Sequence, residues 1–525
     1  MTVTVPGIAA RLADRPEAVA LVESRGGTSR TTRRGELVRR CHHLAEALRD
    51  AGVRPGHKAV VMTRDAHDLT AVSYALGILG AVPVLIEPRA EVGRCLRDVA
   101  PDVFIGEPLA HLGRRALGWG RPHIGISLVT GPAPLPPGRR LPTRTPVGGA
   151  PPARLPEPDG DGPALIAFTS GSTGRPKGAE YHHSTLAGQL DALTALIGPR
   201  PDDVLLAGFL PVALLGPLLG LTTVAPAVNH LAPARTPPGE LVAPMLRHRA
   251  TVVLASPAVL TLIARHCARH GVTLPSVRQI LSFGAPLRLR LVDALRRAVP
   301  DDAEILSVYG ATECLPVSAI GDHELRASRV RPPAGHAGTC LGRPLAGVRA
   351  RILDADTTGA GEIAVTGPTV SPAYHARPDA DAATKSDTGH GVLHRTGDLG
   401  RLDDEGRLWF LGRKAHLVTG AGFTLATEDI EAAADTAPGI RRTALVGVGT
   451  SVCQLPVLCV EPLPSTPRAA ALAAVRAVLR DHPQGHRVAA LLIRTGFPTD
   501  PRHNSKIDRM RLAGWAAGRL RGRAR

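Results

Sequence analysis

The chain is poor in cysteine and in aromatic residues. The first shortage argues against disulfide-rich and zinc-binding proteins, and the second indicates what the core is made of. Seven cysteines are scattered over 525 residues without a Cys-x-x-Cys pair. The sequence therefore shows no disulfide framework and no zinc site, and it is typical of a protein with free thiols in a reducing cytoplasm. Aromatic residues make up 3% of the chain, so we expect a core built mainly from Leu, Val, Ala and Ile.

Long apolar runs are also missing. No stretch approaches the roughly 20 consecutive apolar residues that a membrane-spanning helix needs. The N-terminus has no basic run followed by an apolar one, which a signal peptide would show. We therefore expect a cytoplasmic protein without a transmembrane segment. The length of 525 residues and the hydrophobic content of 44% are typical of a globular protein with two or three domains.

Lysine is scarce although the formal net charge is +17: of the 63 basic residues, five are lysines and 58 are arginines. The arginines are spread along the chain and do not cluster with aromatic residues, so nucleic-acid binding is not predicted. In a chain whose usual cation is arginine, a lysine can mark a position that needs a compact ammonium group. Lys177, Lys414 and Lys506 lie in the motifs described below, whereas Lys58 and Lys385 do not.

Helical and strand-like patterns alternate near the start of the chain. The spacing of apolar residues predicts helices over Arg34–Ala51 and Ala71–Gly80, and strands over Lys58–Met62 and Val82–Ile86. Strands that alternate with helices predict a mostly parallel sheet. Residues 131–163 are rich in Pro, Gly and Arg without periodicity, and we expect a long exposed connection there.

The strongest local signal follows an apolar run at Ala164–Phe168, which predicts a strand. The residues after it combine hydroxyl side chains, glycines and one lysine: Thr169, Ser170, Gly171, Ser172, Thr173, Gly174 and Lys177. Glycine lets backbone N–H groups approach an anion closely, so the segment predicts a polyphosphate-binding loop. It is not a Walker loop, because Lys177 is followed by Gly178 and not by Ser or Thr. A flexible linker is the alternative, but a plain linker has no need of the Pro-Lys-Gly sequence at its end.

The loop resembles the phosphate-binding signature of the AMP-forming adenylating superfamily, which includes acyl-CoA synthetases, luciferases and adenylation domains. Further stretches resemble other motifs of that superfamily in the same order along the chain: 280–286, 308–313, 394–400, 408–416 and 502–509. The resemblance implies an α/β fold with a large N-terminal domain of mixed sheets flanked by helices and a small mobile α+β C-terminal domain. It places the ATP- and acyl-binding domain at residues 1–412 and the C-terminal domain at 413–525.

Two of these motifs imply contacts with the base, the phosphates and a metal. The backbone of Gly284, Ala285 and Pro286 corresponds to the segment that lies against adenine in the superfamily, and a purely structural turn is the alternative. Tyr309 offers a ring face for stacking on a purine. By the same resemblance Thr312 and Glu313 are catalytic: Thr312 bonds the α-phosphate, and Glu313 holds Mg²⁺, a hard cation that prefers carboxylate and phosphate oxygens.

The last two motifs imply contacts with the ribose and with the reacting groups. Asp398 can accept hydrogen bonds from both ribose hydroxyls because a carboxylate offers two oxygens, and Arg413 corresponds to an arginine near the ribose at the start of the hinge. Lys506 corresponds to the catalytic lysine that bridges the substrate carboxylate and the α-phosphate. Its charge would offset the negative charge that grows in the transition state. Without the other motifs, Lys506 would be interpreted as a solvated surface lysine.

The acyl-binding residues are less clearly indicated. A histidine at the position of His183 often borders the acyl pocket in the superfamily, but a packing role is as good an interpretation. The segment that begins at Phe209 and runs to Gly220 is almost wholly aliphatic and contains two prolines. It can either line a pocket for an apolar acyl chain, with Phe209 in contact with the substrate, or form core.

Within the superfamily, several stretches resemble the β-lactone synthetases of olefin and lactone biosynthesis: 104–119, 309–316, 409–416 and 497–507. Such enzymes use ATP and Mg²⁺ to adenylate a β-hydroxy acid, whose own hydroxyl then displaces AMP to close a lactone. The implied substrate is a β-hydroxy acid or fatty acid, and the implied partners are other enzymes of a lipid or lactone pathway.

An AMP-forming ligase that passes the acyl group to CoA or to a carrier protein is the alternative. Such ligases commonly carry Asp or Lys two residues after the hinge arginine, where this chain has Ala415, and Ser505 replaces the glycine that usually precedes the lysine at 506. A nucleotide-binding protein that has lost catalysis is the third hypothesis.

Overall fold

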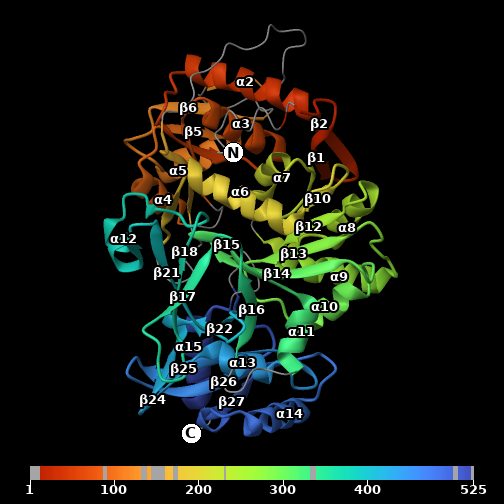
Figure 1. The fold of residues 1–525 in the computed structure, drawn as a ribbon, viewed down its shortest axis with the longest axis vertical. Helices are drawn as coiled ribbons and strands as arrows, with labels where there is room; N and C mark the ends of the chain where they lie inside the picture. The colour runs from red at the N-terminus through yellow and green to blue at the C-terminus, as the bar shows by residue number, and fades with distance from the viewer. Residues whose placement is uncertain are drawn as a thin grey trace.

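The computed structural model describes residues 12, 14–86, 91–131, 139–142, 160–168, 175–229, 232–330, 338–499 and 507–521. Two extended sheets and their helices form a large N-terminal part, and a smaller α+β unit follows at the blue end of the chain (Figure 1). The predicted fold class is therefore confirmed.

The first sheet is mostly parallel, as the alternating pattern predicts. Its antiparallel pairs lie at one edge, where β9 follows β8 and pairs with both β8 and β19. Residues 169–177 connect β8 to β9. The strands in spatial order are β19 (Ala373–Tyr374), β9 (Gly178–His182), β8 (Pro163–Phe168), β4 (Val82–Leu85), β3 (Lys58–Met62), β5 (Val103–Gly106), β6 (Ile126–Val129) and β7 (Arg139–Arg140).

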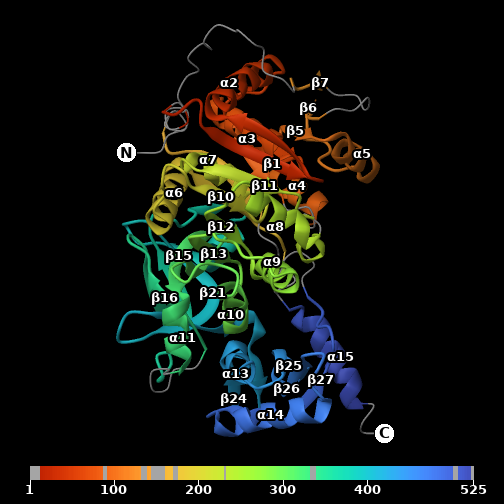
Figure 2. The ribbon, with the colours of Figure 1, turned by 90° about the vertical axis from the view of Figure 1, so that its right-hand side faces the viewer.

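Helices of the N-terminal part pack on this sheet and against each other (Figure 2). The helix predicted from Ala71 begins earlier, because Asp65 caps it by accepting a hydrogen bond from the N–H of Asp68 at 2.8 Å. The predicted connection at 131–163 contains the short strand β7 and the start of β8. The helices are α2 (Arg34–Asp50), α3 (Ala66–Ile78), α4 (Val92–Val99), α5 (Pro108–Leu117) and α6 (His183–Ile197).

The second sheet runs through the middle of the molecule and changes character along its length. The strands from β1 to β14 on the path β1-β11-β10-β12-β13-β14 are parallel, and the strands beyond β14 are antiparallel. Its strands in spatial order are β17 (Arg349–Leu353), β18 (Gly361–Thr366), β21 (Val392–Leu402), β22 (Leu408–Arg413), β16 (Thr339–Pro344), β15 (Cys314–Gly321), β14 (Glu304–Ala311), β13 (Gln279–Phe283), β12 (Val252–Ala255), β10 (Val204–Ala207), β11 (Thr222–Pro226), β1 (Val19–Arg25) and β2 (Thr28–Arg33), with β20 (Lys385–Asp387) beside β21.

The helices that cover this sheet share its aliphatic core. Leucines of α6 pack against the strands β10, β12 and β13, and α8, α9 and α10 bury leucine, valine and isoleucine on the same sheet. The core is thus built from the residue types that the composition predicts. The remaining helices of the large part are α7 (Val212–Leu218), η1 (Pro233–Arg235), α8 (Pro238–Arg247), α9 (Pro257–His270), α10 (Leu289–Arg296), α11 (Asp322–Val330) and α12 (Pro378–Thr384).

The C-terminal unit has its own three-stranded sheet and its own apolar core. None of the helices in the described ranges is long and apolar enough to cross a membrane. The predicted boundary between 412 and 413 falls at the end of β22 and stays a prediction. The elements that follow are η2 (Lys414–His416), β23 (Val418–Gly420), β24 (Phe423–Leu425), α13 (Thr427–Ala434), β25 (Ile440–Thr450), β26 (Cys453–Pro462), α14 (Arg468–Asp481), η3 (Gly485–Arg487), β27 (Ala490–Ile493) and α15 (Arg509–Arg521).

Candidate active site

Two of the predicted nucleotide-binding motifs lie at the carboxyl ends of neighbouring parallel strands, β13 and β14. Phe283 at the end of β13 pairs in register with Val308 of β14. The turn 284–286 and the motif that begins at Tyr309 therefore meet at one edge of the sheet. Gly284 has a φ of +94°, and a Cβ on this residue would have no other atom within 4 Å, so glycine is required there by the backbone conformation and not by crowding. The carboxyl ends of parallel strands are where α/β folds commonly bind ligands.

Asp398 lies between two residues of the predicted nucleotide site. Its β21 position pairs in register with Arg413 of β22, and Arg413 Nε lies 3.0 Å from Asp398 Oδ1. The Tyr309 hydroxyl donates a hydrogen bond of 2.8 Å to Asp398 Oδ2. Burial and then the charge of Asp398 raise the pKa of Tyr309 well above its ordinary value, so the hydroxyl stays a donor. The structure thus brings together three side chains that the sequence predicts for the nucleoside.

Glu313 lies in the turn between β14 and β15 and is held by Tyr374. The Tyr374 hydroxyl donates to Glu313 Oε1 at 2.6 Å, and the Glu313 carbonyl accepts from the N–H of Ser371 at 2.8 Å. Burial by itself raises the pKa of Glu313, but interactions with His394, the Tyr374 hydroxyl and Lys177 outweigh it and keep the pKa below its usual value. Glu313 is therefore an ionised carboxylate.

An ionised carboxylate fits the expected magnesium ion. The described parts of the chain contain no group of three or more His, Cys, Asp or Glu that could hold a metal. Mg²⁺ is commonly bound through one or two carboxylates together with substrate phosphates, so the single carboxylate of Glu313 suffices for such a site.

Lys177 approaches the same tyrosine from the end of the predicted phosphate loop. Its Nζ lies 4.4 Å from the centre of the Tyr374 ring, and Tyr374 pairs in register with Ala179 at the start of β9. The backbone carbonyl of Thr312 accepts a hydrogen bond from the Tyr181 hydroxyl on the same strand. Two tyrosines thus contact three residues of the predicted site: Tyr181 bonds Thr312, and Tyr374 contacts both Glu313 and Lys177.

Part of the predicted site lies outside the described residues. This applies to six residues of the predicted phosphate loop and to the predicted catalytic lysine: Thr169, Ser170, Gly171, Ser172, Thr173, Gly174 and Lys506.

Among the described residues, no hydrogen bond or ion pair joins the two predicted acyl-binding residues to the nucleotide site. His183 is the first residue of α6, and burial lowers the pKa of its imidazole. Phe209 follows β10 and is 38% exposed, whereas Val212 and Ala213 of the following α7 are buried. The aliphatic segment is therefore largely core, and the roles of His183 and Phe209 stay predictions.

Comparison with known proteins decides the family. A model described as "AMP-binding enzyme" matches residues 8–375. The chain belongs to this family. It is 40% identical over 523 residues to an olefin beta-lactone synthetase of Xanthomonas campestris pv. campestris, with 92% of this chain and 90% of that protein covered. It is 38% identical over 524 residues to an olefin beta-lactone synthetase of Stenotrophomonas maltophilia, with 93% of this chain and 92% of that protein covered.

Solved structures support the fold. The amide bond synthetase McbA from Marinactinospora thermotolerans matches with a TM-score of 0.80 at 24% identity, covering 98% of this chain and 99% of that one. O-succinylbenzoate Coenzyme A Synthetase from Bacillus subtilis, solved with ATP and magnesium ion, matches with a TM-score of 0.71 at 20% identity, covering 96% of this chain and 98% of that one.

By its family and its two relatives, this AMP-binding enzyme is an adenylate-forming ligase, similar to olefin β-lactone synthetases over nearly its whole length.

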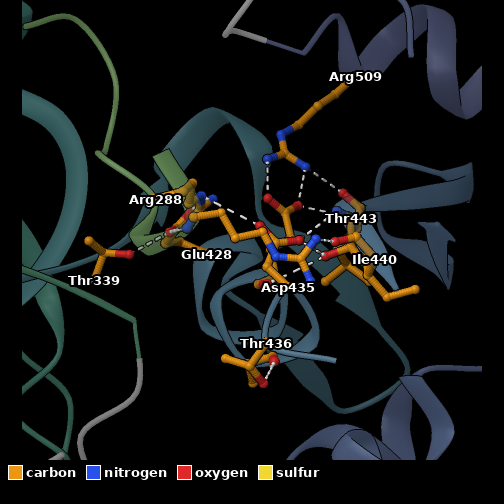
Figure 3. A network of polar contacts seen from close by, with 12 residues as sticks. Arg288, Thr339, Glu428, Asp435, Thr436, Ile440, Thr443 and Arg509 are labelled. Atoms are coloured by element: carbon orange, nitrogen blue, oxygen red, sulfur yellow. Dashed lines mark hydrogen bonds and ion pairs between the residues drawn. The ribbon is translucent and has the colours of Figure 1, made fainter. Parts of the chain in front are cut away.

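Ion pairs between a half-buried arginine and two largely buried carboxylates join the two parts of this AMP-binding enzyme (Figure 3). Arg288, just before α10, contacts Glu428 of α13 through two nitrogen–oxygen pairs at 2.6 and 3.2 Å, and its Nε lies 3.4 Å from Asp435 Oδ2. The Thr339 hydroxyl donates to Glu428 Oε1 at 2.6 Å. Because Glu428 is 5% exposed, these contacts replace its hydration and hold α13 against the large part.

A second ion pair involves Glu431, which lies about one turn after Glu428 on α13. Arg509, the first residue of α15, donates to both oxygens of Glu431 at 2.5 and 2.8 Å and to the Leu445 carbonyl at 2.8 Å. Burial by itself would lower the pKa of Arg509, but the Glu431 carboxylate outweighs it and raises that pKa. The contact ties the start of α15 to α13.

Tyr181 and Tyr374 were not predicted from the sequence. The chain has four tyrosines, and three of them donate a hydrogen bond to a residue of the predicted motifs: Tyr181 to Thr312, Tyr309 to Asp398 and Tyr374 to Glu313. Tyrosine is even scarcer than lysine in this chain, and that scarcity was the signal that could have pointed to both residues.

Proposed function

We propose that this protein catalyses the ATP-dependent adenylation of a β-hydroxy acid, with a 2-alkyl-3-hydroxy fatty acid as the expected substrate, and then closes the acyl adenylate to a β-lactone. AMP and pyrophosphate are the other products. The observation that carries the proposal is the 38–40% identity to two olefin beta-lactone synthetases over more than nine tenths of the chain.

The nucleoside end of ATP is assigned to the pair of strand ends described above. Adenine lies beside Tyr309 and the turn 284–286, and the ribose hydroxyls donate to Asp398. The ion pair with Arg413 and the hydrogen bond from Tyr309 hold that carboxylate in place before the nucleotide arrives, which lowers the entropy that binding costs.

The phosphates are assigned to the loop 169–174, Lys177 and Thr312, with Glu313 as the protein ligand of Mg²⁺. When bound, the ion neutralises charge on the phosphate oxygens. Tyr374 fixes the Glu313 carboxylate by its hydrogen bond of 2.6 Å, so one oxygen is oriented by the protein.

The reaction then needs two attacks on an oriented substrate. The carboxylate oxygen of the acid attacks the α-phosphorus, with Lys506 offsetting the negative charge, and pyrophosphate leaves. The β-hydroxyl next gives up its proton, its oxygen attacks the acyl carbon, and the bond between that carbon and the phosphate oxygen breaks, so that AMP leaves. The second nucleophile belongs to the substrate itself, so orientation replaces a second substrate.

The proposal also concerns the C-terminal domain, residues 413–525, as the carrier of Lys506. A lactone-forming enzyme does not have to admit a thiol at the hinge, which agrees with Ala415 at a position where CoA ligases commonly have Asp or Lys. The CoA ligase hypothesis has some support from a 28% identity to feruloyl-CoA synthase of Amycolatopsis over 429 residues.

The test is to incubate the protein with Mg·ATP and a 2-alkyl-3-hydroxy acid, without and with CoA, and to identify the acyl product by mass spectrometry. We expect lactone, AMP and pyrophosphate without CoA. AMP formation that depends on CoA, with a thioester as product, would instead establish the ligase. Lys506→Ala serves as the inactive control and should abolish pyrophosphate release.

A further inference from the structure

Lys385 lies in the cluster around Tyr374 although it belongs to none of the motifs in the sequence. It is the first residue of β20 and pairs in register with His394 of β21. Its Nζ lies 5.1 Å from the centre of the Tyr374 ring, and the Nζ of Lys177 lies 4.4 Å from the same centre. Two of the five lysines in the chain thus contact one tyrosine whose hydroxyl holds Glu313.

The ammonium group of Lys385 has more N–H donors than hydrogen-bond acceptors among the described residues. It donates one hydrogen bond, to the Ser371 carbonyl at 2.5 Å, and within the described ranges it forms no ion pair. An ammonium group has three N–H donors, and removing it from water is costly unless those donors are paired. Burial lowers the pKa of Lys385, as expected for a cation that has lost part of its hydration.

A purely structural role explains these observations less well. The nearby carboxylates already have other partners: Glu313 accepts from the Tyr374 hydroxyl, and Asp381 accepts from the Tyr374 N–H at 2.9 Å. The buried Nδ1 of His394, beside Lys385 in the register, makes no hydrogen bond within the described part of the chain. Within the described residues, the Lys385 ammonium thus has N–H donors to spare, and His394 Nδ1 has no hydrogen-bond partner.

We propose that Lys385 is a second lysine of the polyphosphate site, which together with Lys177 binds the β- and γ-phosphates of ATP and the pyrophosphate formed from them. This assignment rests on the proposed function. Lysine suits the position because a compact ammonium can serve several phosphate oxygens as a point charge. Lys385 comes from β20 and Lys177 from the connection before β9, so the two charges reach the phosphates from different sheets.

The experiment compares the affinities of Mg·ATP, Mg·pyrophosphate and AMP by isothermal titration calorimetry, without acid substrate. The variant Lys385→Met removes the charge and keeps the length of the side chain, and Lys385→Arg keeps the charge. Lys58→Met is the matched control, because Lys58 is on β3 and two strands, β8 and β4, separate it from β9.

We expect K385M to weaken Mg·ATP and Mg·pyrophosphate by about 10- to 100-fold, the usual effect of losing one charged hydrogen bond. AMP lacks the β- and γ-phosphates, so its affinity should not change. K385R should retain most of the pyrophosphate affinity, and K58M should bind all three ligands like the wild type.

Equal losses for ATP and AMP, or no loss for either, would overturn the assignment. If K385M does not fold, as judged by circular dichroism, K385Q takes its place, because its amide can still donate to the Ser371 carbonyl, and the same losses are expected. A wild-type protein that binds neither Mg·ATP nor AMP would contradict the proposed function itself, whereas normal binding by the wild type together with unchanged K385M contradicts only the role of Lys385.

Discussion

The buried pair between Glu431 and Arg509 offers a sharp test of how the C-terminal unit is held together. Glu431 is 2% exposed, and its Oε1 also accepts from the N–H of Leu445 at 2.7 Å. The substitution Glu431→Gln preserves the shape of the side chain. It replaces one carboxylate oxygen by an NH₂ group, which then faces the N–H donors of Arg509.

The expected magnitude follows from this environment. Removing one partner of a buried, hydrogen-bonded ion pair costs about 3–5 kcal/mol, because the other charge stays buried without compensation. The matched control is Glu405→Gln. Glu405 contacts Arg407 at 2.6 Å, but its side chain is 57% exposed, so the loss should be below about 1 kcal/mol.

Hydrogen–deuterium exchange by mass spectrometry measures both losses in the intact protein, since local opening free energies appear as exchange rates. A loss of about 3 kcal/mol accelerates exchange by about 100-fold, and we expect this in peptides from α13 and from the start of α15. Acid-dependent pyrophosphate exchange should slow as well, because Arg509 lies three residues after Lys506. The reasoning is refuted if E431Q accelerates exchange in these peptides no more than E405Q does around β22.

Two further predictions concern pH and the ribose. Burial lowers the pKa of His67 from 6.5 to about 4; the imidazole bonds the Thr32 hydroxyl at 2.8 Å. Between about pH 6.5 and pH 4 the unfolded chain therefore takes up a proton at His67 that the folded chain does not. The contribution of His67 to the free energy of unfolding is complete above about pH 6.5 and is lost as the pH falls toward about 4, by about 3 kcal/mol in all. Urea unfolding midpoints at several pH values should show this loss in the wild type and less of it in His67→Gln; equal pH profiles would contradict it. Asp398→Asn leaves an acceptor for Tyr309 but removes the charge that pairs with Arg413, and we expect AMP and ATP to bind about tenfold or more weakly by calorimetry while pyrophosphate binds normally. Unchanged AMP affinity would reject Asp398 as the ribose ligand.

Local patterns in the sequence were sufficient for many of the elements. The helix at Arg34–Asp50 and the strands at Lys58–Met62 and Val82–Leu85 lie where apolar periodicity and turn residues predict them, because both signals act within one or two turns of chain. The helix α3 was predicted five residues late, although Asp65 at its N-cap is itself a local signal.

The sequence by itself determined the family, the order of the motifs and the chemistry of each residue, since a carboxylate or an ammonium carries its charge wherever it lies. Only the tertiary structure decided which of these groups meet. Tyr374 reaches Glu313 across 61 residues, and Arg288 reaches Glu428 across 140. Such contacts depend on strand register and on the packing of whole sheets, which no local pattern encodes. Lys385 lies outside every motif of the sequence for the same reason: only the pairing of β20 with β21 brings it to the tyrosine that Lys177 also contacts.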